Sequence, residues 1–211
     1  MEAVQILGRS SSHYTRLPRI FAHELGVPYE LVPILDITAV DPDVFAGNPA
    51  LKLPILRRRG SALFGSENMC RALAELAGKQ QRVVWPEQLR SDRARNAHEL
   101  VSLAMAAQVQ IVFGTVVNKL PADNPYFTKA RSGLEGALRW LDANLAGLLA
   151  ELPADRDLSL FEVTLFCALQ HVNFRGTTST EPYGALAKLE QEFAARPSAL
   201  ATPYRFDAPA A

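Results

Sequence analysis

Leu53 and Pro54 are two adjacent residues whose types could create a binding site from the backbone alone. The stretch Leu53-Pro54-Ile55-Leu56 has the composition of a buried strand, but proline lacks the N–H that a sheet requires, so it is confined to edges, bulges and turns. A cis bond before Pro54 would instead turn the chain and expose the Leu53 N–H and C=O to a ligand. Because only about 5–6% of X-Pro bonds are cis, this prediction depends on the surrounding elements.

The residues before Pro54 predict a strand, a helix and a second strand. Val4 to Leu7 is a short apolar strand, and the polar cluster of residues 9–13 leads into a helix that ends at Gly26. Residues 27–35 are apolar and rich in β-branched side chains. This order normally gives two parallel strands joined by a right-handed crossover.

The residues after Pro54 predict an antiparallel hairpin followed by a helix. Residues 53–64 contain two apolar runs separated by a turn at Arg59-Gly60, and Ser66 then begins a helix that extends to Ala77. Together the two halves predict a compact βαβ-ββα domain over residues 1–78.

The rest of the chain predicts helices only. Residues 79–92 are polar and are interpreted as a linker, and residues 93–211 as an all-helical domain. Leucines recur at helical spacing between Leu134 and Leu152, and Ser159 and Glu162 form a capping-box pattern before an apolar helix. The Ala/Pro-rich residues after Phe206 are expected to be loosely ordered.

Composition excludes several classes of protein. The 211 residues are 48% hydrophobic, and 22 basic residues balance 22 acidic ones, so we expect neither a nucleic acid nor a membrane as partner. Cys70 and Cys167 lie in apolar helical stretches without metal-ligand spacing, so we expect reduced core cysteines and no metal. The N-terminus lacks a signal-peptide pattern, which predicts a cytoplasmic protein.

Several short motifs follow one another along the chain. They are Ser12-His13-Tyr14-Thr15-Arg16, Asn48-Pro49, Lys52-Leu53-Pro54-Ile55-Leu56, Ser66, the Ser159–Glu162 capping box and Arg196-Pro197-Ser198. In this order they resemble the motifs of the cytosolic glutathione transferases. That family combines a thioredoxin-like N-terminal domain with an all-helical C-terminal domain, so the resemblance implies the glutathione transferase fold, a glutathione-binding domain over residues 1–78 and a homodimer.

The resemblance implies that Ser12 activates the thiol of glutathione. A free thiol has a pKa of about 8.5, so glutathione is mostly protonated at neutral pH, and a donor aimed at its sulfur favours the thiolate. Ser12 would supply that donor at the N-terminus of the first helix, although a plain N-cap serine fits the sequence equally well. The adjacent hydroxyls of Ser10 and Ser11 remain alternatives.

Four further residues are implied to contact glutathione, and Pro54 is implied to shape their site. Leu53, before Pro54, would pair its backbone with the cysteinyl amide, as a strand pairs with an extended peptide. Ser66 would bind the γ-glutamyl carboxylate at a helix N-terminus, Glu67 the γ-glutamyl ammonium, and Lys52 the glycine carboxylate. The alternatives are a helix cap for Ser66, a solvated acid for Glu67 and a surface lysine for Lys52.

The sequence departs from the family pattern at three positions. Gly65 stands where an acid or glutamine is expected, which removes one contact to the γ-glutamyl group and predicts weaker binding of glutathione. His13 replaces the usual proline, and Pro18 falls within the first helix, where it is tolerated only near the beginning. Residues 10–13 contain no cysteine, which argues against thiol-disulfide exchange by the enzyme.

The resemblance implies an enzyme that joins glutathione to a small hydrophobic electrophile, with glutathione as substrate and no metal. The electrophile is expected beside residues 9–12 and the apolar segment of residues 103–110. Isomerisation or dehalogenation with glutathione remains open, because the same fold hosts these reactions. The alternative is a non-catalytic binding or protein-interaction module with the same fold, which Gly65 favours.

Overall fold

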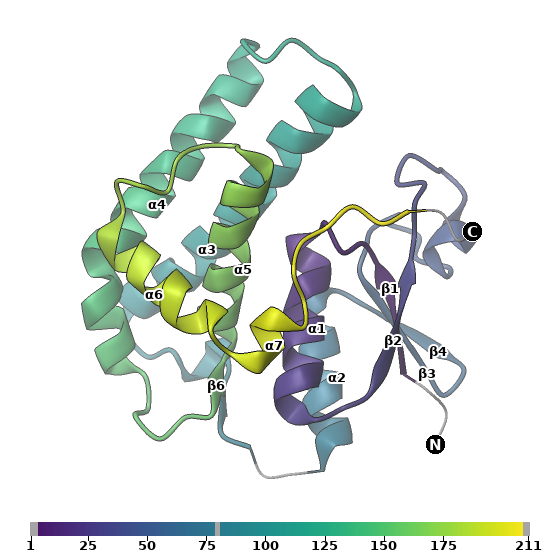
Figure 1. Cartoon of the computed structure of the whole chain (residues 1–211), viewed down its shortest axis with the longest axis horizontal. Helices are drawn as coiled ribbons and strands as arrows, with labels where there is room; N and C mark the ends of the chain where they lie inside the picture. The colour runs from purple at the N-terminus through teal and green to yellow at the C-terminus, as the bar shows by residue number, and fades with distance from the viewer. Residues whose placement is uncertain (1–3, 79–80, 209–211) are drawn as a thin grey trace. The chain divides into compact units, whose positions relative to one another are not determined.

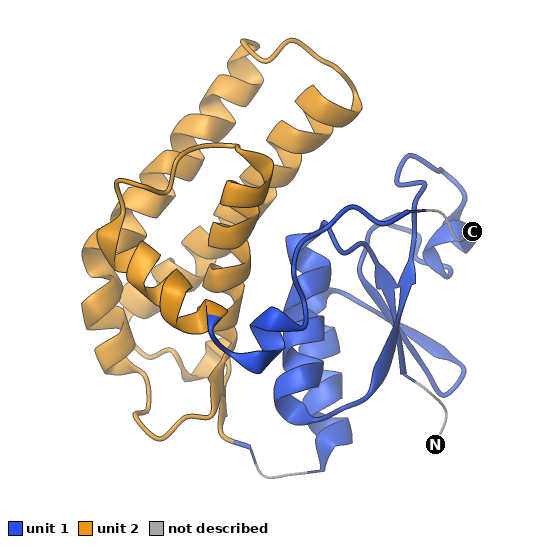
Figure 2. Ribbon diagram, in the orientation of Figure 1, with its two compact units in different colours: residues 1–81, 195–211 blue, residues 82–194 orange. Residues whose placement is uncertain are grey.

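The computed structural model describes residues 4–78 and 81–208. The chain divides into two compact units: unit 1 contains residues 1–81 and 195–211, and unit 2 contains residues 82–194 (Figure 2). The sequence assigned residues 93–211 to a single helical domain, so the structure differs in giving the last 17 residues to unit 1. Residues 79 and 80 of the predicted linker lie outside the described residues.

Unit 1 is built on a four-stranded mixed sheet with the order β2-β1-β3-β4 (Figure 1). The strands are β1 (Val4–Gly8), β2 (Tyr29–Pro33), β3 (Ile55–Arg58) and β4 (Ser61–Phe64). β1 pairs in parallel with β2 and antiparallel with β3, and β3 and β4 form the hairpin. This is the predicted βαβ-ββα arrangement, so the thioredoxin-like fold class is confirmed.

Two helices of unit 1 pack against each other and cover the same face of the sheet (Figure 1). They are α1 (His13–Leu25) and α2 (Ser66–Ala77). Their apolar residues recur at helical spacing, and each helix therefore presents one continuous buried stripe. Large buried members of the two stripes include Leu17, Ile20, Phe21, Met69 and Leu73.

The short 3₁₀ helix η1 (Pro42–Phe45) precedes β3 and contributes Phe45 to an apolar cluster. Phe45 packs there with Leu7 of β1 and Ile55 of β3, and all three are buried. This cluster fixes the loop that leads into Leu53 and Pro54.

The C-terminal residues join unit 1 through polar contacts with α1. The helix α7 (Pro197–Leu200) packs on α1, and the Arg196 guanidinium donates to both carboxylate oxygens of Glu24 at 2.8 Å. The Ser198 hydroxyl donates to the same carboxylate. These partners are 172 and 174 residues apart in sequence, so no local pattern could have assigned α7 to the first unit.

Unit 2 is mostly helical. Its long helices are α3 (Asp92–Ile111), α4 (Pro125–Glu151), α5 (Leu160–Arg175) and α6 (Gly184–Ala194), and a π-helical segment, η3 (Val112–Val117), continues α3. α5 is buried along most of its length and contacts both α3 and α6. The prediction that this helix is central to the helical half agrees with its burial.

Unit 2 also contains a pair of short strands that the sequence did not predict. β5 (Val83–Val84) pairs in parallel with β6 (Leu158–Ser159), next to the 3₁₀ helix η2 (Pro86–Gln88). The Asp157 carboxylate accepts the Arg82 N–H at 2.9 Å and so extends the pairing beyond the strands. Two-residue strands carry no periodic signal, so only the tertiary pairing reveals them.

The continuous helix formed by α3 and η3, residues 92–117, is the one helix in the described part of the chain that is long and apolar enough to cross a membrane by length and composition. Within unit 2 it packs against α4 and α5.

Candidate functional site

The register of the sheet brings three predicted site segments to one edge. Leu7 of β1 and Phe64 of β4 both pair with Ile55 of β3. Because β3 runs antiparallel to both strands, the residues before β3 lie at the same end of the sheet as the residues that follow β1 and β4. The end of β1, the start of α2 and the segment before β3 therefore meet at the same edge.

The bond between Leu53 and Pro54 is cis, as predicted. The Leu53 side chain packs against the cluster of Leu7, Phe45 and Ile55. Across residues 4–78 and 81–208, no hydrogen bond to the Leu53 N–H or C=O is found. Both groups are therefore available to pair with an extended ligand.

Asn48 shapes the turn that leads into Leu53. This side chain is only 4% exposed. Its amide nitrogen donates to the Lys52 C=O at 2.9 Å, and its oxygen accepts the Ala50 N–H at 3.0 Å. The bonds fix the backbone of Lys52, whose own side chain is exposed. The sequence offered Asn48 only as part of the family resemblance, and the structure gives it a physical role.

Ser12 is the N-cap residue of α1. Its hydroxyl oxygen accepts the Thr15 N–H at 3.3 Å. A hydroxyl that accepts through oxygen keeps its hydrogen free to donate, so capping and thiol activation are compatible. Ser12 is half-buried, whereas Ser10 and Ser11 are 0% and 2% exposed. Among the three adjacent serines, Ser12 is the most accessible.

Gly8 and Thr15 hold the start of α1 against the end of β1. A Cβ atom at position 8 would lie 2.4 Å from the Thr15 Oγ1, so only glycine fits there. The same oxygen accepts the Arg9 N–H at 3.3 Å, and the Ser12 N–H closes a turn onto the Arg9 C=O at 3.1 Å. The loop that carries Ser12 is therefore a defined turn.

Ser66 is the first residue of α2 and bonds to the first turn of α1. Its hydroxyl donates to the Tyr14 C=O at 2.9 Å. This carbonyl lacks its usual helical donor because the residue four positions later is Pro18, which has no N–H. Pro18 therefore leaves the Tyr14 carbonyl free to accept a hydrogen bond from Ser66. This bond gives a structural reason for the proline within α1, which the sequence marked as a departure from the family pattern.

The N-terminus of α2 retains backbone donors for an anion. Its N-cap residue, Gly65, provides no side-chain hydrogen bond, and the first helical bond runs from the Met69 N–H to the Gly65 C=O. The N–H groups of residues 66–68 precede that bond and point out of the helix end. Together with the helix dipole they form a site suited to a carboxylate.

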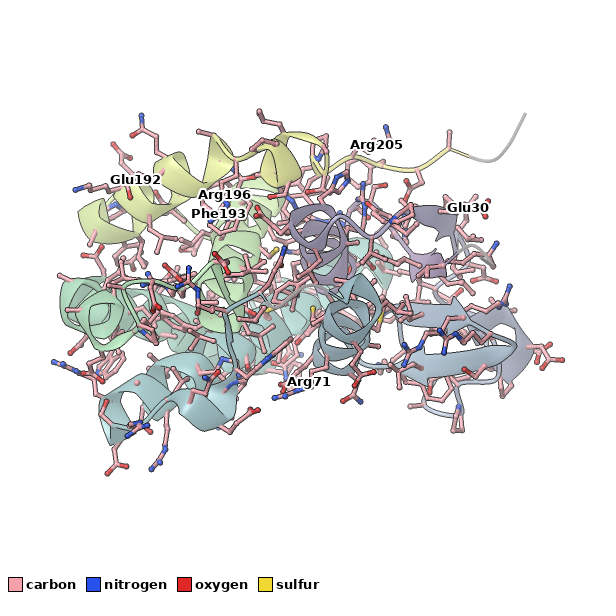
Figure 3. All side chains as sticks on the ribbon, turned by 90° about the horizontal axis from the view of Figure 1, so that it is seen from below. Glu30, Arg71, Glu192, Phe193, Arg196 and Arg205 are labelled. Carbon is pink, nitrogen blue, oxygen red and sulfur yellow. The ribbon has the colours of Figure 1, made fainter. Side chains whose placement is uncertain are left out.

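Glu67 and Tyr14 are two further titratable residues of this region. The Glu67 carboxylate accepts from Nε and Nη2 of Arg71 at 3.0 and 2.8 Å, so its charge is already paired on the helix surface. Arg71 projects from α2 in Figure 3. Burial raises the pKa of the Tyr14 phenol above its ordinary value, which keeps it neutral at neutral pH. The described residues contain no group of three or more His, Cys, Asp or Glu that could hold a metal ion.

The arrangement can therefore bind an extended peptide-like molecule that carries a carboxylate. Leu53 offers backbone groups, the start of α2 offers anion donors, and Ser12 offers a hydroxyl at the start of α1. All three lie in unit 1.

Comparison with known proteins shows which fold this chain has. Residues 11–76 match the family model of the glutathione S-transferase N-terminal domain. A glutathione transferase family member from Pseudomonas fluorescens Pf-5, solved with bound glutathione, has a TM-score of 0.79 at 22% identity, over 96% of this chain and 100% of the other. A glutathione S-transferase from Methylobacterium radiotolerans, in complex with glutathione sulfonate, has a TM-score of 0.74 at 22% identity, over 99% of each chain. The search of curated proteins finds no match.

Proposed function

Because residues 11–76 form a glutathione S-transferase N-terminal domain and the chain has the glutathione transferase fold, we propose that this protein conjugates glutathione to a small hydrophobic electrophile. The observation that carries the proposal is the convergence of Leu53, Ser12 and Ser66 at one edge of the unit 1 sheet. Similar structures hold glutathione or its sulfonate, which supports glutathione as the substrate here.

Glutathione would bind as a short added strand. The cysteinyl amide pairs with the backbone of Leu53, and the γ-glutamyl carboxylate lies on the free N–H groups at the start of α2. Lys52 is exposed and can approach the glycine carboxylate. Glu67 remains the candidate for the γ-glutamyl ammonium, and it would share its charge with Arg71.

Ser12 would stabilise the thiolate. Its oxygen accepts the Thr15 N–H, which leaves its hydrogen to donate to the sulfur, and the positive end of the α1 dipole would add to the stabilisation. The thiol proton leaves to water, the sulfur lone pair forms the bond to the electrophilic carbon, and the leaving group departs with the displaced electron pair. The more complete burial of Ser10 and Ser11 favours Ser12 for this role.

The rival is a non-catalytic module with the same fold. Two observations favour it: Gly65 carries no side chain for the γ-glutamyl group, and the Ser66 hydroxyl already donates to Tyr14. The paired state of Glu67 points the same way. A homodimer and a role in detoxification are further parts of the proposal and follow from the family resemblance. Localisation in the cytoplasm is also proposed, on the N-terminal sequence pattern alone.

The test compares the wild type with Ser12→Ala and Ser12→Thr on immobilised glutathione and in conjugation of a chloronitroarene. We expect the wild type to bind and turn over, Ser12→Ala to lose roughly 10²–10³-fold in kcat, and Ser12→Thr to retain more activity because it keeps a hydroxyl. A wild type that binds without turnover would support the non-catalytic module. Equal turnover of Ser12→Ala and wild type would reject Ser12 and return the assignment to Ser10 or Ser11.

A further inference from the structure

The residues that follow α7 form an extended strap, residues 203–208, along unit 1. In Figure 1 the chain leaves α7 beside α1 and continues toward the sheet, and Figure 3 labels Arg205 on this segment. The strap has no helical or strand conformation. Side-chain contacts at two positions hold it.

The first attachment is Arg16 of α1. This arginine is only 2% exposed, and its guanidinium donates to the Ala199 C=O at 3.3 Å and to the Thr202 Oγ1 at 3.4 Å. The guanidinium carbon also lies 4.4 Å from the centroid of the Tyr204 ring, a cation–π distance. The strap is therefore fixed to α1 where it begins.

The second attachment is Asp207, near the end of the described chain. Its carboxylate accepts the Ser10 N–H at 2.7 Å, across 197 residues of sequence. Hydrogen bonds to an ionised acceptor are about twice as strong as those between neutral groups. The buried Ser10 hydroxyl has no hydrogen-bond partner within residues 4–78 and 81–208, so the bond to Asp207 is the polar anchor of this residue.

Ser10 lies inside the turn that carries Ser12. The Ser12 N–H closes this turn onto the Arg9 C=O, and Ser12 then caps α1. A displacement of Ser10 would therefore shift the Ser12 hydroxyl relative to a bound sulfur. Misplacement of a reacting group by about 1 Å can cost on the order of 10²-fold in rate.

We propose that Asp207 is a positioning residue for the thiol site, which holds the turn of residues 9–12 in place through the Ser10 N–H. This inference rests on the proposed function, since it assigns the turn to thiol activation. Asp207 acts through Ser10 and does not itself contact the substrate. The sequence predicted a loosely ordered end after Phe206. Residues 209–211 of that end lie outside the described residues, and Asp207 has a defined partner.

The test uses the full chain with Asp207→Ala, Asp207→Asn and, as a matched control on the same strap, the exposed Arg205→Ala. Three quantities are measured: hydrogen exchange of the Ser10 amide by NMR, the ultraviolet thiolate absorbance of bound glutathione, and the steady-state rate of conjugation, which gives kcat and KM for glutathione. We expect Asp207→Ala to speed Ser10 exchange by roughly 10- to 100-fold, because a hydrogen bond to a charged group is lost.

The thiolate fraction and kcat should fall in Asp207→Ala, while KM for glutathione changes little because Leu53 and the start of α2 are intact. Asp207→Asn keeps an acceptor oxygen and should give smaller changes in the same direction, also serving as the test if Asp207→Ala does not fold. Arg205→Ala should match the wild type in all three quantities.

Unchanged Ser10 exchange in Asp207→Ala would overturn the proposal, and so would faster exchange with an unchanged thiolate fraction. A wild type that binds glutathione without turnover would reject the proposed reaction only, because the thiolate absorbance still measures the effect of Asp207. A wild type that does not bind glutathione would overturn both.

Discussion

Ser66 gives its hydroxyl hydrogen to the Tyr14 carbonyl, and this limits what the residue can offer a ligand. A serine hydroxyl donates only once, so a carboxylate at the start of α2 must be bound mainly by backbone N–H groups. The side chain acts as a link between the two helices, whose N-termini form the two ends of the candidate site.

We therefore predict that Ser66→Ala lowers stability more clearly than it lowers glutathione affinity. The free energy of unfolding should fall by about 0.5–1.5 kcal/mol, because the hydrogen bond to Tyr14 is lost. The dissociation constant for glutathione, measured by calorimetry, should rise less than tenfold. Ser132→Ala, at an exposed position of α4, is the matched control. A larger loss of affinity at unchanged stability would show that the hydroxyl binds the ligand directly.

Gly65 has a backbone that other residues rarely adopt, with φ of 88° and ψ of 132°. The family pattern has an acid or glutamine at this position, but the backbone conformation here suits glycine. We predict that Gly65→Ala destabilises the protein by roughly 1–3 kcal/mol in denaturant unfolding, because the backbone is strained for any residue with a Cβ.

Gly133→Ala is the control for Gly65→Ala. Gly133 lies in α4, has ordinary helical geometry, and a Cβ there would meet no atom within 4 Å. That substitution should be neutral or stabilising by up to about 1 kcal/mol. Equal effects at the two positions would contradict the conformational argument.

The role of Pro18 shows why residue types alone did not give these contacts. The sequence identified this proline as a departure that a helix tolerates only near its start. It could not show that the freed Tyr14 carbonyl would meet Ser66, which lies 52 residues further along the chain. Ser12 was predictable as a helix cap, with the Thr15 N–H three residues later as its local partner. The cap alternative for Ser66 is wrong, because Gly65 is the N-cap of α2 and the Ser66 hydroxyl bonds to Tyr14 instead.

At the level of elements, the turn of residues 48–52 positions Leu53 through one buried side chain. We predict that Asn48→Ala loses the bonds to Ala50 and Lys52 and is destabilised by about 1–3 kcal/mol. It should also bind glutathione more weakly by calorimetry, because the Leu53 backbone is no longer held. The exposed Asn96→Ala on α3 should change neither quantity. If Asn48→Ala is destabilised but binds glutathione with wild-type affinity, the turn does not contribute to binding.

The charged contact beside the paired strands β5 and β6 should make the stability of unit 2 depend measurably on pH. The Arg82 backbone N–H and guanidinium hold the pKa of Asp157 below its ordinary value of 3.8. A carboxylate with a lowered pKa in the folded state stabilises the protein above its unfolded pKa, and this contribution disappears as pH falls through the folded value.

We predict that Asp157→Asn is less stable than the wild type at neutral pH, and that the difference shrinks as pH falls below 3.8. Urea unfolding at a series of pH values measures it. Asp123→Asn, at an exposed position before α4, should follow the wild-type curve. A stability difference that is independent of pH would contradict the role of the Asp157 charge.

Elements with a strong hydrophobic period were predictable, and elements that depend on distant partners were not. α2 begins and ends at the predicted residues, Ser66 and Ala77, because its apolar stripe is regular. β5 and β6 were missed because each has two residues and exists only through pairing across more than 70 residues.

At the scale of the whole chain, the first and last residues belong to the same unit. Glu24 and Arg16 of α1 bind Arg196, Ala199 and Thr202, and Ser10 binds Asp207. The sequence assigned the last residues to the helical half by continuity, because nothing local distinguishes them. The glutathione transferase fold itself was predicted from the order of short motifs and is confirmed.

The central claim is that unit 1 binds glutathione and stabilises its thiolate at the start of α1. The most direct measurement is a pH titration of the ultraviolet thiolate absorbance of glutathione bound to the wild type and to Ser12→Ala. We predict that the pKa of the bound thiol lies clearly below the free value of about 8.5 in the wild type and returns toward that value in Ser12→Ala. A bound thiol that titrates at the free value in the wild type, or no binding at all, would contradict it.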